Sequence, residues 1–250
     1  MRKSSDLLLN IRMGFNSVAI FHLIFAAIMI LSIDMSHDED PRISVYIHVR
    51  WKLITCWFNL LLLAYFPISL YCDWKEKQGK WNEERVRFFR KIRDYMMTGI
   101  LFPITMFSDF TFWLLWLRDP ALIAPLAIFR YLPVWAQHSL HTLSAFKVML
   151  DILLLPRRRP KNWLPNAAVT VAFVVIYGST LAISLSQGEI IYSLFEICSC
   201  IEITAFALFS FIQISFFYVM QWYIIDFVWG GKPHENGFVN GVSSHKIKSH

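Results

Sequence analysis

The stretch MGFNSVAIFHLIFAAIMILSI, residues 13–33, contains no Lys, Arg, Asp or Glu and is long enough to cross a bilayer. A helix needs about 20 predominantly apolar residues to span the hydrocarbon core. The rest of the chain has the same character, since 56% of its 250 residues are apolar and only 17% are charged. The mean hydropathy is +0.45. These values predict one integral membrane domain rather than a soluble protein.

Five more segments approach or reach the spanning length: residues 53–72, 95–117, 132–155, 167–186 and 204–225. Each is continuously apolar rather than alternating, and lipid offers no partner to an unpaired backbone group, so each is expected to be a helix. The predicted fold class is all-α: a polytopic integral membrane protein with six transmembrane helices and short interfacial or re-entrant segments. The membrane domain would cover residues 1–229, and residues 230–250 would form a flexible cytoplasmic tail.

Lys and Arg are concentrated in the N-terminal tail, residues 73–94, residues 156–165 and the C-terminal tail. With six spans these segments fall on one side, and the positive-inside rule makes that side cytoplasmic, with both termini facing it. The net charge of +6 therefore reflects topology and attraction to anionic lipid, and we expect no nucleic-acid partner. The last five residues, KIKSH, resemble a dilysine retrieval signal. This favours the endoplasmic reticulum, with the plasma membrane as the other candidate compartment.

Two connections carry expectations of their own. Residues 74–94 mix basic and apolar side chains, which suits a helix lying on the membrane surface, and an ordinary basic loop fits the composition equally well. Residues 120–133 are apolar, too short to span, and contain Pro120, Pro125 and Pro133. This pattern predicts a re-entrant or interfacial turn that would roof a cavity.

A hydroxyl and two imidazoles lie at or inside predicted spans: Thr55 in the run RWKLIT, and His138 and His141 in the run WAQHSLHT. An ionisable group in hydrocarbon is costly, so an intramembrane histidine points to a functional site. The second and fourth spans enter from the same side, and a rise of about 1.5 Å per residue places Thr55 a few ångströms deep and His141 about 14 Å deep. Gln137 and His141 share a helix face, and Asn59 lies one turn below Thr55.

A threonine hydroxyl becomes a nucleophile when a base takes its proton, and a neutral histidine can do so near neutral pH. Thr55 and His141 together would suit acyl transfer. Two plainer interpretations stay open: a hydroxyl that bonds a carbonyl one turn back, and histidines that only pack. Asp109, Lys147 and Asp151 also lie within predicted spans, where they could pair. We expect Lys147 and Asp151 to be structural, and Asp109 to be either structural or substrate-facing.

Other familiar chemistries lack their motifs. The chain has no Gly-x-Ser-x-Gly, no His-Glu-x-x-His and no glycine-rich phosphate loop. His138 and His141 have a spacing that a metal could use, but membrane di-iron enzymes need many more histidines near one membrane face. We therefore expect no metal and no cofactor.

At these residues the chain resembles the family of androgen-induced protein 1 and the androgen-dependent TFPI-regulating protein, polytopic hydrolases of fatty acid esters of hydroxy fatty acids. Residues 135–142 are similar to the family's Trp-Leu-Asn-His-x-Met-His-Thr, and residues 51–55 to its Trp-Lys-x-Leu-Thr. The similarity extends over residues 51–229. Further agreement lies in the spacing of Gly188, Tyr192 and Glu196.

The resemblance implies a nucleophile at Thr55 and a catalytic partner at His141, acting on a lipid ester that enters from the bilayer. Support for the substrate or for an oxyanion would come from Lys52, Asn59, Gln137 and His138. The chain departs from the family pattern at Gln137, which replaces asparagine, at Ser139, and at Leu140, which replaces methionine. Glutamine keeps the amide but lengthens its reach, so the resemblance does not carry over the substrate preference.

Two non-enzymatic functions compete with this interpretation. One is a lipid-binding or channel-like protein in which His138, His141 and Asp109 line a polar cavity or proton path. The other is a structural or regulatory partner of other membrane proteins, in which a surface loop such as residues 74–94 matters more than the intramembrane residues.

Overall fold

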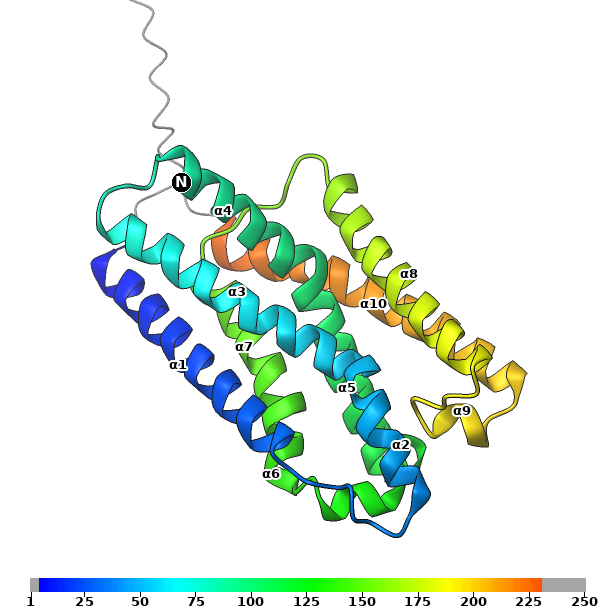
Figure 1. Ribbon diagram of the computed structural model, residues 1–250. Helices are drawn as coiled ribbons and strands as arrows, with labels where there is room; N and C mark the ends of the chain where they lie inside the picture. Colours follow the sequence, from blue (N-terminus) through cyan, green and yellow to red (C-terminus); the bar gives the residue numbers. More distant parts are fainter. Residues whose placement is uncertain (1–4, 231–250) are drawn as a thin grey trace, which may run out of the picture.

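The structure is a computed structural model that describes residues 5–230 (Figure 1). Within that range the chain forms helices and no strand. The longer helices are α1 (Asp6–Leu31), α3 (Ile54–Lys77), α4 (Glu84–Met96), α5 (Phe102–Arg118), α7 (Leu143–Leu154), α8 (Leu164–Ser186) and α10 (Cys200–Trp229). The shorter ones are α2 (Pro41–Val49), α6 (Val134–Gln137), α9 (Leu194–Ile197), the 3-10 turns η1 (Arg50–Lys52), η3 (Pro120–Leu122) and η4 (Leu126–Arg130), and the π-helical turns η2 (Met97–Leu101) and η5 (His138–Thr142).

Five helical stretches are long and apolar enough to cross a membrane: Asp6–Leu31, Ile54–Lys77, Glu84–Arg118, Leu164–Ser186 and Cys200–Trp229. They confirm the prediction of an all-α polytopic membrane protein. The predicted fourth span, residues 132–155, is helical from α6 through η5 to the end of α7. It is less apolar than the other five because it carries Gln137, His141 and Lys147, all of which are buried. A sixth crossing stays a prediction.

Residues 74–94 comprise the last turn of α3, a short connection at residues 78–83 and most of α4, so neither expectation describes the whole segment. Helix α3 continues to Lys77, and α4 begins at Glu84 and runs through η2 into α5 as one helix of 35 residues, Glu84–Arg118. Helix α4 packs against α3, and Val86 and Arg93 on this helix are fully buried, whereas Phe88 is exposed. The neighbouring helix α3 is thus one partner of this amphipathic segment.

The helices pack around a core centred on α3, α5 and η2. Helix α1 lies along α3, α10 and α7 pack on α5, and α8 docks against η2 (Figure 1). The contact of α8 needs Gly99, because a Cβ there would lie 3.2 Å from Cγ1 of Val169 and 3.3 Å from the carbonyl oxygen of Asn166. The hydroxyl of Thr170 donates to the carbonyl of Gly99 at 2.5 Å. A π turn interrupts the regular hydrogen-bond ladder of a helix. In η2 the carbonyl of Gly99 instead accepts from Thr170 of α8.

The connections gather at two ends of the bundle. The α3–α4 and α7–α8 connections lie at the end where α1 begins and α10 finishes, while α2, residues 119–133 and α9 lie at the opposite end (Figure 1). The two internal basic segments therefore share one end, as the charge pattern requires, and Arg157 reaches Asp94 across them at 3.5 Å. The side of the membrane that this end faces stays a prediction. The predictions for the terminal tails and for KIKSH concern residues outside 5–230.

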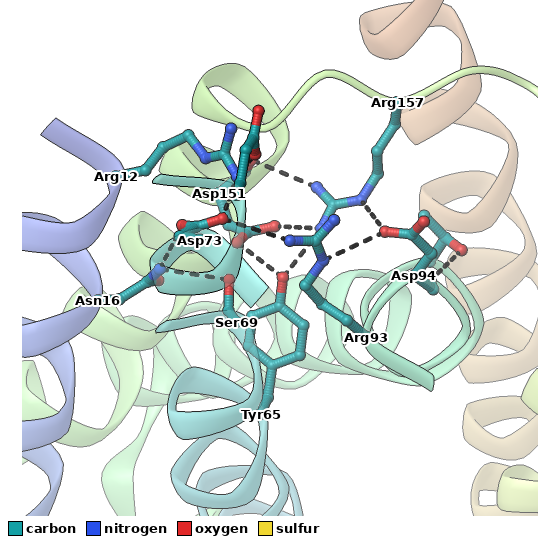
Figure 2. Close-up of polar contacts among 11 residues, drawn as sticks. Arg12, Asn16, Tyr65, Ser69, Asp73, Arg93, Asp94, Asp151 and Arg157 are labelled. Atoms are coloured by element: carbon teal, nitrogen blue, oxygen red, sulfur yellow. Dashed lines mark hydrogen bonds and ion pairs between the residues drawn. The ribbon is translucent and has the colours of Figure 1, made fainter. Parts of the chain in front are cut away.

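A buried ionic network closes the basic end (Figure 2). It joins α1, α3, α4, α7 and the segment after α7 through Arg12, Asn16, Tyr65, Ser69, Asp73, Arg93, Asp94, Asp151 and Arg157. Asp73 accepts from Arg12 and from Asn16, and Arg157 pairs with Asp151 at 2.7 Å. Charges taken out of water destabilise a fold unless they are paired, so these contacts fix how the four helices are arranged.

Candidate active site

A cavity of about 310 Å³ lies between α3, α5, η5, α8 and α10. Residues 122–132 and the segment that contains α9 close it at the end opposite the basic connections, so the proline-rich stretch does roof a cavity as predicted. Most of the wall is aliphatic or aromatic, with Ile104, Phe107, Phe173, Phe206 and Ile214 among its residues. Its polar members include Thr55, Ser108, Thr111, Gln137, His141, Tyr177, Tyr192 and Ser210. An apolar cavity with a few convergent polar groups is typical of a ligand site.

Thr55 lies in the first turn of α3. Leu53 precedes the helix in an extended conformation (φ −65°, ψ 137°), and the N–H of Ile54 donates to the hydroxyl of Tyr192 at 3.0 Å. Among residues 5–230 the Thr55 hydroxyl has no hydrogen-bond partner, whereas the hydroxyls of Thr98 and Thr180 each bond the carbonyl one turn back. The plainer interpretation of Thr55 therefore does not apply. Thr55 lines the cavity, and its hydroxyl is uncommitted.

His141 is positioned by the π turn η5, and it is only 5% exposed. Its ring stacks on Phe112, with ring centroids 3.6 Å apart and planes 3° apart. Nδ1 lies 3.2 Å from Oδ1 of Asp109, and Nε2 makes no hydrogen bond within the described part of the chain. A carboxylate at Nδ1 favours the tautomer whose proton is on that nitrogen, which leaves the Nε2 lone pair free to accept a proton. His141 thus has the orientation of a general base.

Asp109 on α5 lies behind His141, outside the cavity lining. Its second oxygen, Oδ2, lies 2.5 Å from the hydroxyl of Ser144, which is also 2.6 Å from the carbonyl oxygen of Leu140. Asp109 is 2% exposed and Ser144 is fully buried. The carboxylate is therefore held on both sides by the helix that carries His141, and it fixes the imidazole ring in turn.

Of the four residues expected to support the substrate, only Gln137 lines the cavity. The other three, Lys52, Asn59 and His138, lie outside the lining. Lys52 forms an ion pair with Glu189 and donates to Ser184 at 3.0 Å, so its charge is engaged elsewhere. Asn59 donates to the Thr55 carbonyl oxygen at 2.9 Å from outside the lining.

His138 is the fourth, and it is exposed on the far face of its helix. Its Nδ1 lies 3.0 Å from the hydroxyl of Thr142, and its ring lies beside Trp113. The two histidines therefore do not converge on a common point. Within residues 5–230, no three His, Cys, Asp or Glu side chains are grouped as a metal site.

Asp109, Lys147 and Asp151 could have paired, but among residues 5–230 no hydrogen bond or ion pair joins any two of them. Asp109 bonds His141, and Asp151 bonds Tyr65 at 2.7 Å and Arg157 at 2.7 Å. Lys147 approaches a histidine of α1 that the sequence did not single out: its Nζ lies 2.9 Å from Nδ1 of His22. A polar group in a span signals that a partner exists, but the choice of partner depends on helix rotation, which the sequence does not show.

Sequence reasoning left two tyrosines of the cavity wall out of the site, Tyr192 in the connection before α10 and Tyr177 on α8. Tyr192 bonds the start of α3, and its hydroxyl lies 2.8 Å from that of Tyr177 on α8. Burial raises the pKa of Tyr192, so the phenol is protonated at neutral pH. The sequence drew attention to Tyr192 only through the spacing of Gly188, Tyr192 and Glu196. It did not indicate that Tyr192 would bond the first turn of α3, which carries Thr55.

The chain is similar to known proteins over most of its length. Androgen-dependent TFPI-regulating protein from Homo sapiens is 26% identical over 181 residues, covering 72% of this chain and 78% of that protein. The Rattus norvegicus protein of that name is 26% identical over 194 residues, covering 77% and 83% of the two chains. Androgen-induced gene 1 protein from Homo sapiens is 23% identical over 168 residues, covering 65% and 63%. No solved structure matches significantly. The family model described as FAR-17a/AIG1-like protein matches residues 17–224, a range that contains the whole cavity lining, and the chain belongs to that family.

Proposed function

We propose that this protein is an intramembrane hydrolase of lipid esters with Thr55 as nucleophile and His141 as general base. One observation carries the proposal: an uncommitted threonine hydroxyl and a carboxylate-oriented histidine line the same apolar cavity. A nucleophile, a base and a third group that orients the base are the general signature of covalent acyl transfer. In this chain the third group is Asp109.

Each residue has one task in the reaction. Nε2 of His141 takes the proton of the Thr55 hydroxyl as Oγ1 bonds to the ester carbonyl carbon, and the carbonyl electron pair moves onto oxygen. Collapse of this intermediate breaks the bond to the alcohol, which leaves with the proton held by His141. Water then attacks the acyl-threonine carbonyl carbon while Nε2 of His141 takes a proton from the water. Collapse of this second intermediate breaks the bond to Thr55 Oγ1, which receives that proton, and the fatty acid is released. Asp109 accepts from Nδ1 throughout and stabilises the imidazolium.

The cavity wall supports a lipid substrate. Phe173, Phe206 and Ile214 belong to helices α8 and α10, whose outward faces expose large apolar side chains such as Val175 and Phe209. An ester with long acyl chains can reach such a cavity from the bilayer without crossing water. Esters between a fatty acid and a hydroxy fatty acid are the substrate class that the family resemblance implies, and they place a carbonyl in the middle of a largely apolar molecule.

The test is hydrolysis by purified protein in lipid nanodiscs, with a fatty acid ester of a hydroxy fatty acid as substrate. Thr55→Ala and His141→Ala should each lower kcat by roughly 10³-fold or more, since members of a catalytic unit fail together. Thr180→Ala is the matched control, because Thr180 is a helical threonine outside the cavity lining whose hydroxyl bonds its own helix. Full activity of Thr55→Ala, or an inactive but well-folded wild type across ester chain lengths, would overturn the proposal in favour of a non-catalytic lipid-binding protein.

A further inference from the structure

The hydrolase proposal lacks a group to stabilise the oxyanion, and the residues first considered do not supply it. Lys52 is paired with Glu189, and Asn59 and His138 lie outside the cavity lining. Gln137 reaches the cavity, but its Nε2 lies 3.5 Å from the carbonyl oxygen of Leu132. A donor aimed at the developing charge is usually the largest single contribution to acyl-transfer catalysis, so the cavity should contain another one.

Two phenols of the cavity wall meet beside the nucleophile. The oxygen of Tyr192 accepts from the N–H of Ile54 at 3.0 Å, and Ile54 is the residue before Thr55. The same oxygen lies 2.8 Å from the hydroxyl oxygen of Tyr177. Both tyrosines line the cavity that contains Thr55 and His141.

The contact of Ile54, Tyr177 and Tyr192 contains one more hydrogen-bond donor than it has hydrogen bonds. The Ile54 N–H and the two phenolic O–H groups are three donors, and they make two hydrogen bonds: one from Ile54 to Tyr192 and one between the tyrosines. Whichever tyrosine donates in the second bond, one phenolic hydrogen has no acceptor within residues 5–230. A polar hydrogen buried in an apolar wall without an acceptor is costly, so it needs a ligand atom.

The surroundings hold the phenols in place. The Tyr177 ring packs edge-on against Trp57 of α3 at 5.3 Å. The segment that carries Tyr192 is anchored to the start of α3 by the ion pair of Glu189 with Lys52, and to the cavity roof by the Ser193 N–H at 3.4 Å from the carbonyl oxygen of Ile123. A donor that is fixed before the reaction costs no reorganisation when charge develops.

We propose that the Tyr177–Tyr192 pair is the oxyanion donor of this site, with the hydroxyl of Tyr192 donating to the ester carbonyl oxygen. Tyr177 donates to Tyr192, whose two lone pairs are then occupied by Tyr177 and Ile54, and the Tyr192 hydrogen faces the substrate. When Thr55 Oγ1 bonds to the carbonyl carbon, the electron pair that moves onto oxygen is stabilised by this hydrogen bond and returns when the alcohol leaves. The inference rests on the proposed hydrolase function.

The test compares an ester with the matched thionoester, in which sulfur replaces the carbonyl oxygen and accepts hydrogen bonds poorly. Tyr192→Phe should lower kcat for the ester by about 10²–10³-fold with little change in KM, as loss of one oxyanion donor does. It should lower the thionoester rate much less, so that the ratio of the two rates falls. Equal losses for both substrates, or no loss, would overturn the inference.

Two controls separate donation from positioning. Ile54→Pro removes the N–H that Tyr192 accepts while leaving the phenol, and proline is tolerated at the first position of a helix. If it lowers the ester-to-thionoester ratio as Tyr192→Phe does, Tyr192 only positions the helix and the inference fails. Should Tyr192→Phe not fold, 3-fluorotyrosine at position 192 keeps the shape with a more acidic phenol, and an unchanged rate ratio would contradict the inference.

Thr55→Ala in the same assay keeps the two claims apart. An inactive Thr55→Ala beside a Tyr192→Phe of wild-type activity refutes the oxyanion assignment alone. An active Thr55→Ala refutes the hydrolase mechanism itself, and the oxyanion assignment with it.

Discussion

Nδ1 of His141 lies 3.2 Å from Oδ1 of Asp109, a carboxylate 32 positions earlier in the chain. The contact joins α5 to the π turn before α7 in the interior of the bundle. The sequence shows that a histidine is present in this span. The contact with Asp109 adds a defined tautomer, with the imidazole proton on Nδ1.

We predict that Asp109→Asn lowers kcat by about 10²–10⁴-fold while the protein stays folded. The asparagine amide can donate to Nδ1, which moves the imidazole proton to Nε2 and removes the base. Ser144→Ala is the control, because it deletes a contact to Asp109 but leaves the carboxylate on His141. Rates of Asp109→Asn within tenfold of wild type would show that His141 does not need this partner.

The two histidines of the His138-x-x-His141 pair should differ sharply. His138 is exposed and contacts Thr142, whereas His141 is buried in the cavity wall. We expect His138→Ala to keep kcat within about threefold of wild type in the ester assay, and His141→Ala to abolish turnover. Comparable losses for the two variants would favour a site that both imidazoles share, such as a metal site or a proton path.

The ion pair of Lys52 with Glu189 should give stability that depends on pH. The hydrogen bond from Lys52 lowers the pKa of Glu189 below its usual 4.5. A carboxylate with a lowered pKa stabilises the fold above its unfolded pKa, and this contribution is lost as pH falls through the folded value. The melting temperature of wild type should therefore exceed that of Glu189→Gln at neutral pH by a small margin, as expected of a partly exposed pair.

The margin should vanish as the pH falls through the lowered pKa of Glu189, where the carboxylate takes up a proton in the folded state too. Lys52→Gln is the matched variant from the other side of the pair. Lys52→Gln should lower the melting temperature at neutral pH by the same margin as Glu189→Gln, and the double variant should lower it little further. A kcat effect of Lys52→Gln that Glu189→Gln does not share would instead restore Lys52 as a substrate contact.

The ionic network at the basic end should matter for stability and not for chemistry. Arg93 is fully buried and contacts Asp73 at 3.4 Å and Asp94 at 3.5 Å (Figure 2). We expect Arg93→Met to destabilise the protein by about 1.5–3 kcal/mol, because it removes a charged contact to the buried Asp73, which then keeps only Arg12 and Asn16 as partners. The measurement is thermal unfolding in detergent, with Arg87→Met, an exposed arginine of the same helix, as control. Equal melting temperatures of the two variants would contradict this role.

Hydropathy predicted the spans because lipid requires long apolar helices, and five of them are present. It did not predict that Glu84–Arg118 is one helix, because α4 looks amphipathic in the sequence and this pattern does not show that α4 packs against α3. Local pattern shows that such a face needs a partner, while only the tertiary fold shows which partner it has.

The candidate site was predictable to a similar degree. Thr55 and His141 could be chosen from residue type, depth and family resemblance, and the structure puts both on one cavity wall. Sequence reasoning noticed Asp109 but did not pair it with His141, and it noticed Tyr192 but gave it no role. Both depend on the rotation of one helix or loop against another, and a single sequence carries no information about that.

The central claim is that Thr55 is a nucleophile, and the most direct measurement is the site of covalent modification by a lipid-like fluorophosphonate. Wild-type protein in nanodiscs should carry one adduct on the peptide that contains Thr55, as mapped by mass spectrometry, and His141→Ala and Thr55→Ala should carry none. Modification elsewhere, or wild-type labelling that persists in Thr55→Ala, would contradict the account.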